Sequence, residues 1–234
     1  MRLADNPVYQ LELSRRQRRR ATAIAPLIVM LVNAVGLSLA MYRAGALLHL
    51  VILSGCVCVA AACPLGVAVG IAHSVASEFA ARRLDALALT QVPAYDILRG
   101  KFHATARTAL AILAAVLAPD LFAVMVALAT GAAVTLDLPA AVVSLAFVGL
   151  AGCYLSGVLG VVAAVVTRAP AAALALAAAT SAVTVMVWVW APLAGAPTGV
   201  LLAWACAAAA VFLACAALGL LLALHLFQRA LSRP

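Results

Sequence analysis

Long apolar runs restrict the fold of this 234-residue chain more than any other feature. A helix needs about 20 consecutive apolar residues to cross the hydrocarbon core of a bilayer. Six runs satisfy this requirement: residues 21–41, 46–75, 108–131, 140–166, 171–191 and 199–227. Because the backbone must satisfy its own hydrogen bonds in lipid, each run predicts an α-helix. We therefore expect an all-α, polytopic membrane protein with six transmembrane helices.

The composition excludes the soluble classes of protein. Hydrophobic residues make up 68% of the chain and charged residues 9%, and the mean hydropathy is +1.20. Soluble domains contain about 45–50% apolar and about 25% charged residues. The few charged side chains are insufficient to solvate the surface that a soluble fold of this size would expose. A soluble enzyme, a secreted domain and a disordered chain are all excluded.

The positions of the basic residues predict the orientation in the membrane. With the N-terminus inside, the inner segments carry fourteen of the fifteen lysines and arginines, and the outer side carries only Arg43. Because excess positive charge marks cytoplasmic loops, we expect both termini in the cytoplasm. The five arginines within residues 15–20 have no interleaved aromatic residues, which indicates membrane lipids rather than nucleic acid as their partner.

One cytoplasmic segment, residues 76–107 between the second and third runs, is rich in charge. It contains five basic residues and three of the seven acidic ones: Glu78, Asp85 and Asp96. Residues 77–90 contain neither glycine nor proline, and Ser77 is a suitable N-cap with Glu78 in the first turn. This pattern predicts an amphipathic helix at the membrane surface that offers a partner an apolar ridge and charges of both signs. An ordinary solvated connector is the alternative.

The same segment carries a motif whose residues follow one another in step, without gaps: Leu84, Asp85, Leu87, Leu89, Thr90, Asp96, Ile97, Leu98, Gly100 and Lys101. It resembles the signature of the ABC-2 type exporter permeases, in which leucine-glutamate and a leucine run precede threonine-proline and then glutamate-isoleucine-leucine-leucine-glycine-lysine. There are differences: Gln91 replaces the usual proline, and Ala80, Ala81 and Arg83 stand where the family often has a glutamate-arginine pair and a threonine.

The N-terminal residues extend this resemblance. They are similar to the amphipathic elbow that opens many such permeases, through these residues: Asn6, Pro7, Val8, Glu12, Leu13, Arg15 and Arg16. The resemblance thus divides the chain into an elbow, residues 1–20, and a single six-helix transmembrane domain, residues 21–234.

The resemblance implies a transport subunit in a bacterial plasma (inner) membrane rather than an enzyme. The chain contains no G-x-x-x-x-G-K-[ST] phosphate loop, so ATP and Mg would bind a separate cytoplasmic ATPase dimer, and this chain would bind no cofactor. The family also implies a second permease subunit, identical or different, and a coupling helix after the second span that docks on the ATPase. The resemblance assigns this role to the following residues: Glu78, Arg82, Arg83, Leu84, Asp85, Leu87 and Thr90.

Asp120 follows Pro119 near the middle of the third run. An ionisable residue at that depth is energetically expensive and is therefore a functional candidate by default. Asp120 could face a substrate path, or it could support a proline-kinked helix. Alternatively, the helix ends early or turns back at Pro119, and Asp120 is exposed to water.

The six cysteines do not predict a metal site. Cys56 and Cys63 share one helical face and Cys58 points nearly opposite, so the three are poorly placed as ligands. Small residues in the fourth run form two ladders that permit close helix packing, within the bundle or at a subunit interface. The ladders are Gly149, Cys153 and Gly157, and Gly152, Ser156 and Gly160.

Two other functions compete with that of an ABC exporter subunit. A non-ABC membrane component, either a small secondary carrier or a subunit that helps assemble a membrane complex, would share the topology but need no ATPase. A rhomboid-type intramembrane protease would use Ser156 and His225. However, Tyr154 stands where a glycine is expected, and the two side chains are predicted at different depths, which keeps a nucleophile and its base apart.

Overall fold

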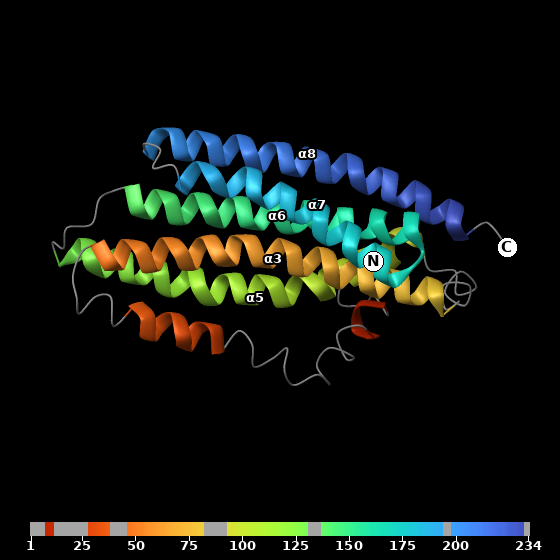
Figure 1. The fold of residues 1–234 in the computed structure, drawn as a ribbon, viewed down its shortest axis with the longest axis horizontal. Helices are drawn as coiled ribbons and strands as arrows, with labels where there is room; N and C mark the ends of the chain where they lie inside the picture. The colour runs from red at the N-terminus through yellow and green to blue at the C-terminus, as the bar shows by residue number, and fades with distance from the viewer. Residues whose placement is uncertain are drawn as a thin grey trace.

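The computed structural model describes residues 8–11, 28–37, 46–81, 93–130, 137–193 and 198–231, and within them all regular structure is α-helical. Five long helices lie in these ranges: α3 (Ala46–Ala80), α5 (Ala94–Ala129), α6 (Asp137–Thr167), α7 (Pro170–Leu193) and α8 (Thr198–Leu231). They lie along the long axis of the molecule, and successive helices run in opposite directions (Figure 1). We use the term inner end for the end at which α3, α6 and α8 finish, because the charge count predicts that it faces the cytoplasm.

Four of these helices, α3, α5, α6 and α8, are long and apolar enough to cross a membrane. The shortest of the four, α6, has 31 residues and is therefore about 46 Å long, against about 30 Å for the hydrocarbon core. The expectation of an all-helical membrane protein is confirmed at this level. Two shorter apolar helices, Ile28–Leu37 and Pro170–Ala182 within α7, coincide with the first and fifth predicted spans. The count of six crossings stays a prediction.

The polar segment after the second predicted span is continuous at both ends with the long helices that flank it. α3 continues to Ala80 and α5 begins at Ala94, so only residues 81–93 separate the two helices. Ser77 lies inside α3, where its Oγ donates a hydrogen bond of 3.1 Å to the Ser74 carbonyl oxygen. The prediction that Ser77 caps a new helix is therefore wrong. Both extensions are stabilised by buried apolar side chains, which include Ala76, Ile97 and Leu98.

α6 contacts each of the other four long helices, and its most extensive contact is with α3. Small residues face each other along this crossing, in three pairs: Gly149 with Ala60, Gly152 with Pro64, and Gly160 with Ala68. A Cβ atom added to Gly160 would lie 2.5 Å from the Ala68 carbonyl oxygen, so the two backbones touch there. We call this contact the α3–α6 seam. It places the predicted small-residue ladder of α6 inside the bundle.

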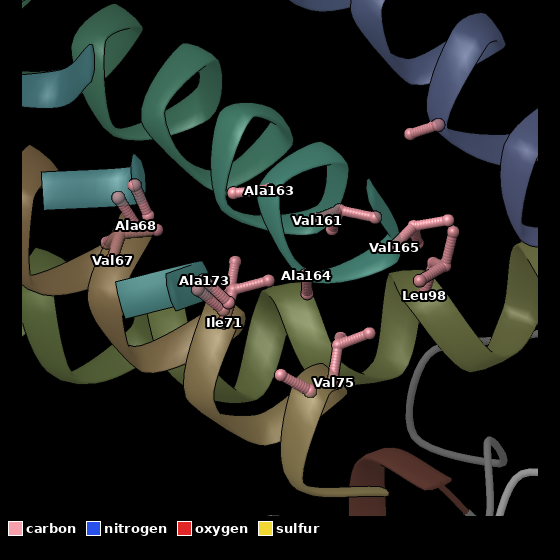
Figure 2. Packing of buried hydrophobic residues seen from close by; sticks show 14 of the residues in the cluster. Val67, Ala68, Ile71, Val75, Leu98, Val161, Ala163, Ala164, Val165 and Ala173 are labelled. Atoms are coloured by element: carbon pink, nitrogen blue, oxygen red, sulfur yellow. The ribbon is translucent and has the colours of Figure 1, made fainter. Parts of the chain in front are cut away.

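A cluster of buried apolar side chains joins α3, α5, α6 and α7 toward the inner end. Figure 2 shows Ile71 and Val75 of α3 among side chains of the neighbouring helices, with Leu98 of α5 near the end of α6. Val8, in the helical turn 8–11, is buried and belongs to the same cluster. This turn is the described part of the predicted elbow. The elbow residues named above lie outside the described residues: Asn6, Pro7, Glu12, Arg15 and Arg16.

Candidate functional site

A buried ion pair links α3 to α5 near the inner end. The Lys101 Nζ atom lies 2.7 Å from the Glu78 Oε1 atom, and the two side chains are 2% and 11% exposed. Lys101 Nζ also donates a hydrogen bond of 3.0 Å to the Ser74 Oγ atom. Ser74 and Glu78 are four residues apart on α3, so one face of that helix supplies both contacts. We call Ser74, Glu78 and Lys101 the inner ion-pair cluster.

The ion pair joins the end of α3 to the beginning of α5, the two helices that residues 81–93 connect. Glu78 is in the last turn of α3, and Lys101 is in the second turn of α5. A charge buried without a partner would destabilise the bundle strongly, whereas the pair leaves no net charge in the interior. The two helices that enter and leave the segment are therefore fastened together where the segment begins.

Phe79, the residue after Glu78, forms a second junction at the same end. Its ring meets the Phe227 ring of α8 edge to face, with centroids 6.1 Å apart. The Arg168 guanidinium lies 5.9 Å from the centre of the Phe79 ring, at the distance of a cation–π contact. Arg168 occupies the short turn between α6 and α7 and has a φ of 52°, the left-handed conformation that reverses the chain after a helix. The ends of α3, α6 and α8 thus meet around one aromatic side chain.

A second polar cluster lies deeper in the bundle. Asp120 of α5 is fully buried, and its Oδ1 atom accepts a hydrogen bond of 2.8 Å from the Asn33 Nδ2 atom. The Cys56 Sγ atom of α3 donates to Asp120 Oδ2 over 3.0 Å. Asn33 Nδ2 also donates to the Val116 carbonyl oxygen over 3.2 Å, one turn before Asp120. We call Asn33, Cys56 and Asp120 the Asp120 cluster.

The surroundings of Asp120 exclude one of its interpretations, that of a residue exposed to water where the helix ends early. α5 continues through Pro119 to Ala129, and Asp120 has no exposed surface, so the helix does not end early there and Asp120 is not exposed to water. Its side-chain partners come from two other helices, Ile28–Leu37 and α3. The carboxylate therefore ties three helices together at a depth where unpaired polar groups are costly.

The remaining predicted coupling residues lie outside the described residues: Arg82, Arg83, Leu84, Asp85, Leu87 and Thr90. Glu78 is described, and it faces Lys101 rather than the surface of the bundle. Its contact in this structure is therefore internal. The partner of Glu78 and the partners of Asp120 were not identified from the sequence. One available signal was that Asn33 is a strongly polar residue inside the first apolar run.

The cysteines lie as the helical geometry predicts, with Cys56 and Cys63 buried and Cys58 exposed. Within the described residues there is no group of three histidine, cysteine, aspartate or glutamate side chains that could hold a metal ion. Ser156 is buried, and its Oγ atom has no hydrogen-bond partner among the described residues, whereas His225 is exposed on α8. These two side chains are not arranged as a nucleophile and its base.

No protein-family model, curated protein or solved structure matches the chain.

Proposed function

We propose that this chain is the membrane-spanning subunit of an ABC-2 type exporter, which moves a substrate across a bacterial plasma membrane with energy from ATP hydrolysed by a separate ATPase. The single observation that carries the proposal is the buried Glu78–Lys101 pair. It closes the base of residues 81–93, the segment whose sequence resembles the coupling helix of those permeases.

The pair gives this segment a mechanical connection to the bundle. A force on residues 81–93 would act on the last turn of α3 and the first turns of α5 together, because Glu78 and Lys101 hold them in contact. α3 in turn is locked to α6 along the α3–α6 seam. ATP-driven closure of an ATPase dimer that contacts the segment would therefore bias the whole bundle between two arrangements, as a switch of this kind requires.

An exporter subunit of this kind would have two protein partners. Residues 81–93 would dock on a cytoplasmic ATPase dimer through the apolar side chains Leu84 and Leu87 and through charges of both signs. A second permease subunit, of the same or a different sequence, would complete the transport path. ATP and Mg would remain on the ATPase, and this chain would bind neither.

Replacing Asp85 with lysine and Leu87 with glutamate tests this assignment. We expect the variant to insert into the membrane at the normal level but to lose copurification with the ATPase and ATP-dependent transport, because both the charge and the apolar ridge are reversed. The matched control is Gln228→Lys, which adds a positive charge at the same end of the bundle, on the exposed face of α8. Unchanged copurification and transport in the double variant would remove the coupling assignment.

The Asp120 cluster favours a second candidate, a secondary carrier that uses an ion gradient. Buried carboxylates within membrane spans commonly mark ion and proton pathways, and Asp120 is fully buried. Against this candidate, both carboxylate oxygens already accept hydrogen bonds from Asn33 and Cys56, as a carboxylate that ties helices together does.

Asp120→Asn separates the two candidates. The amide keeps the size of the side chain and can still accept the hydrogen bond from Asn33, so we expect transport to stay within about twofold of the wild type and to remain dependent on ATP. The measurement is uptake into inside-out vesicles, with membrane insertion checked by the amount of protein recovered. Loss of transport by more than about tenfold, with normal insertion, would favour the gradient-driven carrier.

A further inference from the structure

A cavity of about 270 Å³ lies between α5, α6 and α8, toward the inner end. It forms because α5 and α8 make few contacts with each other, while α6 supports both. The Phe102 and Tyr154 rings stack in its wall with centroids 5.2 Å apart. Most of the remaining lining is aliphatic, and α8 contributes Leu213 and Leu220 among others. The cavity is therefore an apolar groove bounded by an aromatic pair.

One side of the groove is polar and positively charged. Tyr95, Arg99 and His103 all line it and recur every four residues, so they share one face of α5. The Arg99 guanidinium lies 6.0 Å from the centre of the Tyr95 ring. No described carboxylate pairs with Arg99, whereas the neighbouring Lys101 is neutralised by Glu78. Among the described residues, the Arg99 guanidinium thus forms no ion pair, and it lies beside the apolar part of the groove.

The position of the groove along the helices matches one leaflet of a bilayer. Tyr95 and Arg99 lie in the first two turns of α5, at the predicted cytoplasmic surface. Tyr154 lies thirteen residues before the end of α6, which corresponds to about 20 Å. The groove therefore extends from the membrane surface toward the middle of the hydrocarbon core, which is about 30 Å thick. This is the range that one acyl chain of an inner-leaflet lipid occupies.

We propose that this groove is a binding site for an anionic phospholipid, with the phosphate on Arg99 and one acyl chain between α5 and α8. The guanidinium matches an anionic lipid in two ways: it forms paired hydrogen bonds with phosphate oxygens, and the net negative charge of the lipid balances its positive charge. Basic pockets between transmembrane helices at the cytoplasmic side are suited to anionic lipid head groups for this reason. Tyr95 supplies a further polar group at the depth of the head group, and His103 lies one turn deeper than Arg99. The site does not depend on whether the chain is an ABC permease.

Native mass spectrometry of the full chain in detergent, with phosphatidylglycerol or phosphatidylcholine added, tests the site. We expect one phosphatidylglycerol to remain bound and phosphatidylcholine to bind about tenfold less. Arg99→Gln should reduce phosphatidylglycerol binding about tenfold, because it removes a charged hydrogen-bond donor. The matched control is Arg107→Gln, two turns further along α5, exposed and outside the groove. It should bind like the wild type.

Two further arms identify what occupies the groove. Ala217→Phe places a ring in the lining from an exposed position on α8, and we expect it to reduce binding of phosphatidylglycerol without changing the yield of folded protein. Inorganic phosphate at millimolar concentration should not compete, because it has no acyl chain. Equal binding of both lipids by the wild type would overturn the proposal. Equal losses in the Arg99 and Arg107 variants, or full competition by inorganic phosphate, would overturn it as well.

Discussion

Replacing Lys101 with methionine should lower the free energy of unfolding by about 3–5 kcal/mol, the usual loss when one partner of a buried ion pair is removed. Lys101 is 2% exposed, and its Nζ atom contacts Glu78 Oε1 and Ser74 Oγ. Methionine fills most of the same volume, so the expected loss comes from the Glu78 carboxylate, which is left buried and without its cation. The measurement is chemical unfolding in mixed micelles, followed by helical circular dichroism.

A second substitution shows that the effect is electrostatic. Combining Glu78→Leu with Lys101→Met removes both charges, and replacing a buried pair with apolar residues is often neutral or stabilising. We therefore expect the double variant to recover most of the lost stability. Arg107→Met, an exposed cation on the same helix, should change stability by no more than about 0.5 kcal/mol. If Lys101→Met is as stable as Arg107→Met, the pair does not hold α3 to α5.

Replacing Gly160 with alanine should destabilise the protein by about 1–3 kcal/mol, the range for overpacking a close contact. The added Cβ atom would lie 2.5 Å from the Ala68 carbonyl oxygen, and a backbone atom has no rotamer through which it can move away. The helices would have to separate along the α3–α6 seam. The midpoint of thermal unfolding in detergent reports this loss.

Gly66→Ala is the control for the seam, because no atom lies within 4 Å of the position that its Cβ would take. In an open helical position alanine is favoured over glycine by up to about 1 kcal/mol, so this variant should be as stable as the wild type or slightly more stable. Equal midpoints for Gly160→Ala and Gly66→Ala would show that the backbones of α3 and α6 are further apart than the structure places them.

The apolar runs predicted the helices well because hydropathy depends on composition over some 20 residues. The end of α3 and the start of α5 were missed for the same reason. Glu78 and Lys101 count as polar residues wherever they lie, and a window of sequence contains no information on their pairing across 23 residues. The sequence therefore predicted a separate surface helix, whereas Glu78 and Lys101 pair within two packed long helices.

Asp120 was a functional candidate only because of its predicted depth in the membrane. The structure identifies its hydrogen-bond partners, which the predicted depth could not. Asn33 and Cys56 are 87 and 64 residues away along the chain, so only the packing of the helices brings them to the carboxylate. The small-residue ladder was better predicted, because close packing depends on a local pattern of small side chains. The coupling residues from Arg82 to Thr90 and the six-span count stay predictions.

The Gly160–Ala68 contact also limits how this protein can change shape. Because no side chain separates the two backbones at this contact, α3 and α6 lack there the deformable side chains that would let packed helices slide past each other. α3 and α6 would therefore move as one rigid unit in any conformational change. α8 makes few contacts with α5 and with α7, so it is freer to separate from these two helices. Any opening of the bundle should therefore occur beside α8, where the proposed lipid site lies.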